Sequence, residues 1–587
     1  MRINYIDVLK AFAIIAVVLY HAGIMKYGYL GVDLFLVISG YLTTKSLYKA
    51  LILNKPDRRG YLTFELSRVI RLLPPLLIAG IFCMLMGYFV MLPDDYENLS
   101  QSVIATNGFG NNILSAITTK NYWDISNEYK PLMHTWYVGV LMQFYLFYPI
   151  LFYFAHIKKN PKEILITIIS VLAVISLLLY FTTTDTAHRF YYLPSRFFEF
   201  ATGGIVALVY KSKDNQLLGK GIVYFCYALL VFLMFANLEF IPAIVRLVIV
   251  VGLSSLLLCS HEILENKVTG NFVLAKIGTA SYSIFIWHQI ILAFYRYTIT
   301  GKFSLGSYVL LIFLTVLLSW LSYRFIEQKT TEALLVRNRK RRLYIMTAVI
   351  YILLTISACY IYIKAGVVRN IPELGISLDN VHRGMHAEYC DRGYLFDKPF
   401  ETNRRHWLVI GNSYGRDIVN IIIESAISDS VEVSYIEGRR NMAKNKDRFK
   451  EADLIFLSFL GLNEDLVNEV ESQCKASGFD PKNLIVVGEK NFGESNGQVY
   501  IKRYQKDYFN QFVDTEDYNR YIILNREYAK IYGKRYLDMM KLVIDKDNKV
   551  RVFTPNHSFI SEDCYHLTQS GARYYAGLID WNIYLNY

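Results

Sequence analysis

The sequence predicts a multi-pass α-helical membrane bundle followed by an α/β domain with a mostly parallel sheet. From residue 1 to about 365, long apolar runs alternate with short polar clusters, and 53% of the whole chain is hydrophobic. From about 366 to 587, short apolar strands alternate with helical segments. A spanning helix needs about 20 apolar residues, and alternation of strands with helices favours a parallel sheet.

Eleven apolar runs are candidate spans. They lie at about 6–25, 30–52, 72–92, 135–157, 163–182, 197–210, 221–237, 243–260, 280–299, 304–326 and 343–365. The sixth run is short, and it is retained because its neighbours need it for consistent sidedness. We therefore divide the chain into a bundle at 1–335, an eleventh span with a basic flank at 336–365, a linker at 366–405 and an α/β domain at 406–587.

Basic residues gather in the loops after the second, fourth, sixth and tenth runs, at 53–71, 158–162, 211–220 and 337–342. Short loops rich in Lys and Arg stay in the cytoplasm. The amino terminus is then cytoplasmic, and the α/β domain after the eleventh span is extracytoplasmic. This arrangement also explains the net charge of +12, so we expect membrane lipid as a partner and no nucleic acid.

Three cysteines, Cys390, Cys474 and Cys564, lie in the α/β part. An odd number allows at most one internal disulfide there, and the spacing does not identify its partners.

Ionisable residues inside spans are costly and mark functional sites by default. His21 lies in the first run, Asp33 in the second, and His134 at the start of the fourth. Arg196 and Glu199, spaced i, i+3, can form an ion pair. Taken alone, His21 is equally well interpreted as a histidine hydrogen-bonded near the outer interface.

Arg68 and Arg71, also spaced i, i+3, present two cations on one helical face at the cytoplasmic side. Guanidinium groups suit phosphate binding. The alternative is an ordinary positive-inside cluster.

Seven sequence blocks, in order, resemble the acyltransferase family 3 membrane proteins. They are YIDVLKAFAIIAVVLYHAG, GYLGVDLFLVISGYL, SRVIRLLPP, HTWYVGVLMQFYLFYP, SRFFEFATGG, SYSIFIWHQ and SYRFIEQ, spread over residues 1 to about 330. The resemblance implies an O-acyltransferase of bacterial envelope glycans, with His21 as the essential histidine. It also implies that Arg68 and Arg71 engage the acyl donor, usually acetyl-CoA.

One block departs from the family pattern, because Leu141 and Met142 stand where many members have two glutamates. The HTWY form resembles the peptidoglycan-type branch, and this implies Tyr137 as a candidate relay for the acyl group.

In the α/β part, HWLVIGNSYGRD predicts a buried strand at 407–410, a tight turn with Ser413, and a helix starting near Arg416. Further strands are expected at 431–436, 453–459 and 484–487. A serine at a strand-to-helix turn is well placed as a nucleophile, because a helix amino terminus favours developing negative charge.

Near the end, Asp563 precedes His566 by three residues in a loop that a helix follows. The aspartate can orient the imidazole, and the imidazole can activate a serine.

Together these blocks resemble the SGNH hydrolases. The resemblance implies Ser413 as nucleophile, Asp563 and His566 as its partners, and an oxyanion hole built from the Ser413 amide, the Gly438 amide and the Asn463 side chain. Asn412 stands where the family usually has aspartate. A second Gly/Asn-rich segment, 490–497, is an alternative source of the oxyanion hole.

The leading hypothesis is a membrane O-acetyltransferase of the bacterial plasma membrane. It would move an acetyl group from cytoplasmic acetyl-CoA, through an acyl-serine on the exported domain, to a surface polysaccharide, lipid-linked glycan or peptidoglycan. We expect acyl-CoA as a substrate, no bound cofactor and no metal. The alternatives are an exported glycan esterase, an inactive SGNH fold that only binds glycan, and a transporter or receptor without chemistry.

Overall fold

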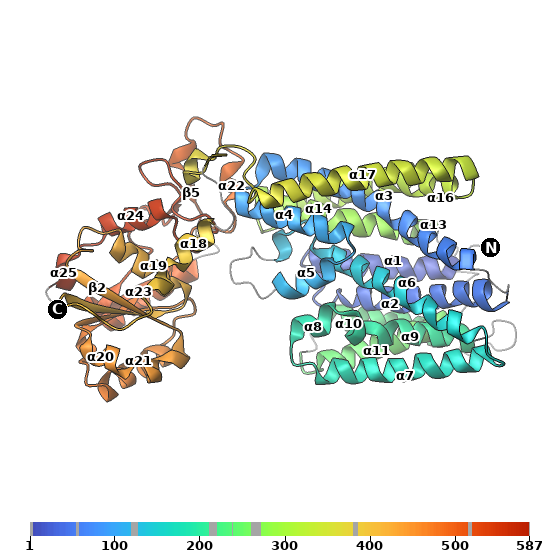
Figure 1. Cartoon of the computed structure of the whole chain (residues 1–587), viewed down its shortest axis with the longest axis horizontal. Helices are drawn as coiled ribbons and strands as arrows, with labels where there is room; N and C mark the ends of the chain where they lie inside the picture. The colour runs from blue at the N-terminus through green and yellow to red at the C-terminus, as the bar shows by residue number, and fades with distance from the viewer. Residues whose placement is uncertain are drawn as a thin grey trace. The chain divides into compact units, whose positions relative to one another are not determined.

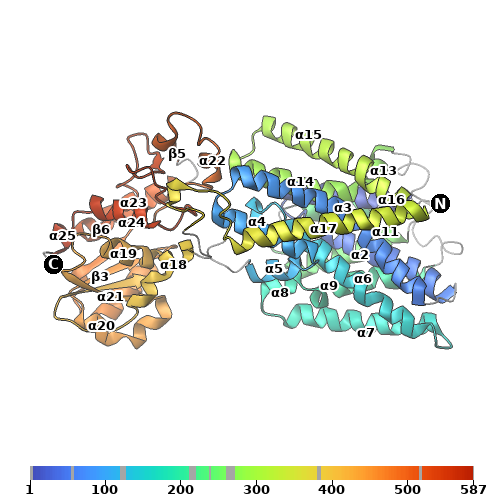
Figure 2. The same ribbon diagram turned by 45° about the horizontal axis from the view of Figure 1, so that its top comes forward.

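The computed structural model describes residues 4–53, 58–118, 127–210, 220–236, 239–259, 272–379, 385–514 and 519–585. The chain divides into two compact units (Figure 1, Figure 2). The first contains residues 1–89, 95–296 and 301–362, and the second contains 90–94, 297–300 and 363–587. Parts of two basic loops, residues 54–57 and 211–219, lie outside the described residues.

The first unit is helical, and its main helices run side by side (Figure 1). They are α1 (Asn4–His21), α2 (Leu30–Leu47), α3 (Arg58–Val90), α4 (Pro93–Asn107), α5 (Asn111–Thr118), α6 (Trp136–Ala155), α7 (Pro161–Thr182), α8 (Thr186–Tyr191), α9 (Leu193–Val209), α10 (Lys220–Phe235), α11 (Ala243–Leu258), α13 (Phe272–Thr279), α14 (Ser281–Thr298), α15 (Leu305–Ser322), α16 (Gln328–Leu334) and α17 (Arg337–Ile363). The stretch between α3 and α6 is largely helical up to residue 118, as α4 and α5.

Six or more of these helices can span a membrane. Within the described residues, six are long and apolar enough, and α13 with α14 makes a seventh if the pair, bent by 75°, is one span. Helices α10 and α11 are apolar but shorter. The expectation of a multi-pass bundle is confirmed at this coarser level, and the total of eleven spans stays a prediction.

The outer helices of the bundle expose apolar side chains. Only 17% of the apolar window of α7 is buried, and 22% of the windows of α15 and α17. Large exposed apolar surfaces mark contact with membrane or partner, which fits these helices as the lipid-facing ones.

Helices α2 and α9 pack with their backbones in contact, and glycine makes this possible. A Cβ added to Gly40 would lie 2.0 Å from the Phe200 carbonyl oxygen, and one on Gly203 would lie 2.0 Å from that of Val37. Small residues at helix crossings allow this approach in membranes. The crossing fixes the distance between Asp33 on α2 and Arg196 on α9.

The second unit is built on a five-stranded parallel sheet with the order β2-β1-β3-β4-β6. The strands are β1 (Arg405–Gly411), β2 (Val431–Glu437), β3 (Leu454–Ser458), β4 (Leu484–Val487) and β6 (Tyr536–Leu537). The four predicted strands are confirmed. The two-residue β6, and the small antiparallel pair β5 (Phe512–Val513) and β7 (Val550–Arg551), were not predicted.

Helices cover both faces of this sheet, because alternate side chains of a strand point to opposite faces. On β1, Trp407 and Val409 join one core cluster, and Leu408 and Ile410 join another. The first cluster includes α19 (Ser413–Ile423) and α24 (Gln569–Leu578), and the second includes α20 (Lys446–Glu451) and α21 (Glu464–Ala476). The other helices of this unit are α18 (Met385–Asp391), α22 (Gly497–Tyr500), α23 (Asn519–Tyr532) and α25 (Asn582–Leu585).

Candidate functional site

Ser413 follows β1 directly and is the first residue of α19. The turn is tight, since a Cβ on Gly411 would lie 2.2 Å from the Ser458 carbonyl oxygen on β3. The helix therefore begins at Ser413, three residues before the predicted start at Arg416, because the Asn412 side chain accepts a hydrogen bond from the Tyr414 amide and caps it.

The hydrogen bonds of Asn412 also explain why asparagine, and not the usual aspartate, stands at this position. Its Oδ1 accepts from the Leu460 amide at 3.1 Å, and its Nδ2 donates to the Leu460 carbonyl at 3.3 Å. A carboxylate can accept but cannot donate. The amide thus ties the exit of β1 to the exit of β3 through both backbone groups of Leu460.

The loop with Asp563 and His566 is closed at its base, where Ser561 bridges Leu567 and the Thr568 amide donates to the Ile560 carbonyl. Inside it, Asp563 Oδ1 accepts from the His566 amide at 2.7 Å. The Asp-to-His spacing of three therefore forms a local turn that holds the carboxylate.

The three predicted triad residues meet in the structure. His566 Nε2 lies 2.9 Å from Ser413 Oγ, and His566 Nδ1 lies 2.5 Å from Asp563 Oδ2. Ser413 and His566 are buried, with 4% and 1% of their surfaces exposed. When Nδ1–H donates a hydrogen bond to Asp563, Nε2 can accept the proton of Ser413. This is the arrangement of a nucleophilic serine.

Two of the three predicted oxyanion-hole residues take part in other hydrogen bonds. The Gly438 amide donates to the Gly411 carbonyl at 2.9 Å, and the Asn463 side chain caps α21 through the Leu466 amide. Among the described residues, the Ser413 amide has no hydrogen-bond partner at its helix amino terminus. Of the three predicted groups, the Gly438 amide is engaged, whereas the Ser413 amide and Asn463 Nδ2, which lies 3.5 Å from the Gly461 carbonyl, remain able to donate to an oxyanion.

The alternative source, segment 490–497, is instead bonded to the Asp563–His566 loop. The Phe492 amide donates to the Cys564 carbonyl at 2.9 Å, and Asn496 Nδ2 donates to the carbonyls of Ser561 and Glu562. The described cysteines are all free thiols, and Cys564 donates to Asn496 Oδ1. This segment clamps the loop in place.

A buried ion pair, absent from the sequence-based prediction, ties the nucleophile helix to the histidine loop. Asp417 on α19 accepts from Lys490 Nζ at 2.7 Å through Oδ2, and from the Leu567 amide at 3.3 Å through Oδ1. Both side chains are at most 2% exposed. Asp417 stands four residues after Ser413, a spacing that places both on one helical face.

Glu489, next to Lys490, supports the loop after β3. Its Oε1 accepts from the amides of Gly461 and Leu462 at 2.9 and 2.8 Å. Burial raises the pKa of this carboxyl above its ordinary value, and those two amides oppose the shift.

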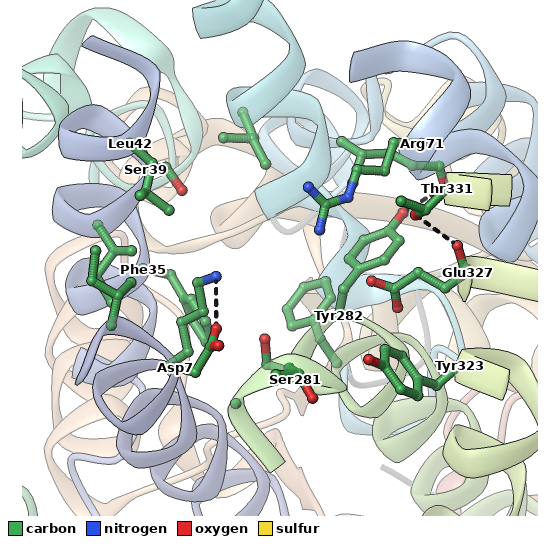
Figure 3. Close-up of a pocket in the computed structure, with 18 of the residues that line it drawn as sticks. Asp7, Phe35, Ser39, Leu42, Arg71, Ser281, Tyr282, Tyr323, Glu327 and Thr331 are labelled. Atoms are coloured by element: carbon green, nitrogen blue, oxygen red, sulfur yellow. Dashed lines mark hydrogen bonds and ion pairs between the residues drawn. The ribbon is translucent and has the colours of Figure 1, made fainter. Parts of the chain in front are cut away.

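Two large cavities lie among the described residues of the bundle. The first, of about 710 Å³, is lined at one end of α1 by Asp7 and Lys10, and by Arg68, Arg71 and Tyr282. Figure 3 shows the Arg71 guanidinium pointing into it. Within the described residues Arg71 forms no ion pair, while Arg68 stacks over the Tyr145 ring at 5.5 Å. The structure thus brings the two predicted donor-binding arginines to one cavity.

Tyr137 also lines the first cavity, and its hydroxyl lies 3.3 Å from Ser39 Oγ. Leu141, which departs from the family pattern, lines it too. An apolar side chain there makes this wall of the cavity less polar.

The second cavity, of about 870 Å³, lies at the other end of α1 and is lined by His21, Asp33 and Arg196. Arg196 is paired with Asp33, and its Nε lies 3.1 Å from Glu199 Oε1. All three of these charged side chains are buried. The predicted motif residues therefore form one network between α2 and α9, beside His21.

His134 lies in neither cavity lining. It is buried, with its ring centroid 4.9 Å from that of Phe285 and 5.3 Å from that of His288 on α14. His288 lies in the SYSIFIWHQ block, and no role was predicted for it.

The family model described as the acyltransferase domain, Acyl_transf_3, matches residues 3–324. The O-acetyltransferase OatA of Staphylococcus aureus strain MRSA252 is 27% identical over 391 residues, which cover 60% of this chain and 61% of the relative. The peptidoglycan O-acetyltransferase OatA of Listeria monocytogenes serovar 1/2a is 29% identical over 345 residues, which cover 55% and 54%. The chain thus spans little more than half the length of these curated relatives.

No solved structure matches the chain. The family model covers more than half of the sequence, and its range ends within the tenth predicted span. On this match, the chain belongs to the acyltransferase 3 family.

Proposed function

We propose that the protein is a membrane O-acetyltransferase that moves an acetyl group from acetyl-CoA to hydroxyl groups of a cell-wall glycan, through an acyl-serine at Ser413. The observation that carries the proposal is the Ser413–His566–Asp563 triad in the second unit of a chain whose first unit belongs to an acyltransferase family. The names of the two OatA relatives support acetyl as the group and peptidoglycan as the acceptor.

The donor is assigned to the first cavity. Coenzyme A carries phosphate groups, and the Arg71 guanidinium points into this cavity with no ion pair among the described residues. Guanidinium binds phosphate through paired hydrogen bonds. The basic loops favour a cytoplasmic position for this end of the bundle, where acetyl-CoA is found, and an outer position for the second cavity with His21.

At the triad, Ser413 Oγ attacks the acetyl carbonyl while its proton moves to His566 Nε2. The carbonyl oxygen becomes an oxyanion next to the Ser413 amide, and Asp563 stabilises the imidazolium through Nδ1. The leaving group departs with the proton from His566. A glycan hydroxyl then gives its proton to His566, attacks the acyl-serine, and Ser413 Oγ recovers a proton.

The test is the O-acetyl content of the cell-wall glycan in cells that carry Ser413→Ala or His21→Ala, with the exposed Ser430→Ala as control. Loss of acetyl groups with the first two variants and retention with the control is the expected result. Full acetylation with both active-site variants would overturn the proposal.

A glycan esterase is the second candidate, because an assembled triad also suffices for hydrolysis. Full-length protein supplied with an acetyl ester, a glycan and water discriminates the two functions. Acetyl groups recovered on the glycan support transfer, and acetate as the only product supports the esterase.

A further inference from the structure

Three imidazoles lie in a row between the two cavities. The ring centroids of His21 and His288 are 5.3 Å apart, and those of His288 and His134 are also 5.3 Å apart. His21 lines the second cavity. Beyond His134 comes the ring of Phe285, which lines the first cavity together with Tyr137. The row therefore spans the layer of protein that separates donor end from acceptor end.

The rings of His288 and His134 each have a nitrogen without a hydrogen bond among the described residues. His288 Nδ1 lies 3.1 Å from the Ile284 carbonyl, which fixes the proton on Nδ1, and Nε2 has no partner among the described residues. The Ile286 carbonyl faces His134, whose ring nitrogens reach no hydrogen bond of normal geometry within that part of the chain. Buried polar atoms in proteins nearly always have partners, so two such imidazoles side by side call for a reason.

The transfer reaction itself supplies a reason. The thioester C–S bond breaks at the donor end and leaves a thiolate there. At the second cavity the first acceptor, a hydroxyl group, takes the acyl group, so a new C–O bond forms and that hydroxyl releases its proton there. Ser413 later takes the acyl group from this ester, and the first acceptor leaves with the proton from His566. The acyl group has then moved outward formally as an acylium cation. One positive charge has therefore crossed the membrane unless the released proton returns to the thiolate.

We propose that His21, His288 and His134 form a proton relay that returns the acceptor's proton to the thiolate while the acyl group moves outward. This inference rests on the proposed function. His21 takes the proton at the second cavity, His288 receives it at Nε2 and passes it to His134, and one water beside Phe285 delivers it to the first cavity. Neighbouring rings at these spacings are within reach of a hydrogen bond or of one bridging water.

The relay makes the transfer electroneutral, and this is a measurable property. Moving one charge through a membrane potential changes an equilibrium by about 50-fold per 100 mV. With the relay intact, the rate of acetyl transfer is independent of the potential. With the relay cut at His288, transfer depends on protons exchanged separately on each side, and a negative potential on the donor side slows it.

The experiment uses full-length protein in proteoliposomes, with labelled acetyl-CoA on one side and peptidoglycan fragments on the other. A potassium gradient with valinomycin sets the potential. We expect His288→Gln to lower transfer at least 10-fold and to make the residual rate fall as the donor side becomes more negative. The matched control is His156→Gln, at a half-buried histidine that directly follows α6 and lies outside the row, and it should behave as wild type in both respects.

A structural role for His288 is separated by chemical rescue. His288→Ala should regain transfer with added imidazole and not with pyrazole, which has the same shape but is a far weaker base. Equal rescue by both rings would overturn the relay. A potential-independent His288→Gln enzyme at wild-type rate would overturn it as well, with the proposed function intact. A wild-type protein that transfers no acetyl group would overturn both.

Discussion

The two units of the molecule arrange their histidines in opposite ways. In the second unit, His566 has a partner at each ring nitrogen, with Ser413 on one side and Asp563 on the other. In the first unit, His134 and His288 have ring nitrogens without hydrogen bonds among the described residues, between the cavities of about 710 and 870 Å³. The triad of the second unit is complete before substrate arrives, whereas the bundle holds ring nitrogens that the described residues leave without partners.

The largest expected effect tests the completed site. Ser413→Ala removes the nucleophile, so acetylation of glycan by full-length protein should fall by about 10³-fold or more. Binding of acetyl-CoA to the bundle should be unchanged. Isothermal titration and product analysis measure the two properties, and a loss of donor binding with Ser413→Ala would contradict the separation of the two sites.

The support beneath the triad is the next test. Asp417→Asn leaves Lys490 as a buried cation without its counter-charge, which costs about 3–5 kcal/mol of apparent stability. The temperature at which full-length protein in detergent loses labelling by a serine-directed probe should drop markedly. Adding Lys490→Met should restore much of the loss. Arg573→Gln, which removes an exposed partner of Glu424, is the control and should cost less than about 1 kcal/mol.

In the bundle, the comparable support is the backbone contact between α2 and α9. Gly40→Ala forces a methyl group against the Phe200 carbonyl, and overpacking of this kind costs about 1–3 kcal/mol. Size-exclusion profiles after heating in detergent should show earlier aggregation. Gly252→Ala, at a glycine with open space around it, should not. Equal behaviour of the two variants would show that the crossing tolerates a Cβ.

The smallest effect concerns Glu489, and its sign follows from the raised pKa. The folded protein holds the Glu489 proton more tightly than the unfolded chain, whose ordinary pKa is 4.5. The stability that this group contributes is therefore present in acid and is lost as the pH rises from about 4.5 through the folded pKa. Glu489→Gln keeps an acceptor for Gly461 and Leu462 and should raise the unfolding temperature slightly at pH 7. An unchanged or lower value at pH 7 would contradict this direction.

Local patterns in the sequence were enough for the four strands and for candidate residues of a triad, which the resemblance to SGNH hydrolases joined into one site. Ser413 was predicted from its place after β1, and Asp563 and His566 from their spacing, since each depends on neighbours in the chain. The start of α19 was misplaced because the capping by Asn412 depends on side-chain geometry. Strand β6 was missed because two residues carry no periodicity.

Long-range pairing accounts for the rest. Lys490 and Asp417 are far apart in the sequence, and each by itself is an ordinary polar residue beside a strand or in a helix. The oxyanion prediction carried over family positions, and the structure engages the Gly438 amide with the Gly411 carbonyl through a contact that the motifs do not encode. His288 gains interest only from its place between the rings of His21 and His134, which three separate helical segments create.

Helix α19 carries both Ser413 and the acceptor for the Leu567 amide, next to His566. A displacement of this helix therefore carries the nucleophile and the base in the same direction. Such a motion changes little in the distance between Ser413 Oγ and His566 Nε2, and it also preserves the alignment needed for proton transfer. If the second unit moves when the proposed glycan binds or leaves, the nucleophile and the base move together.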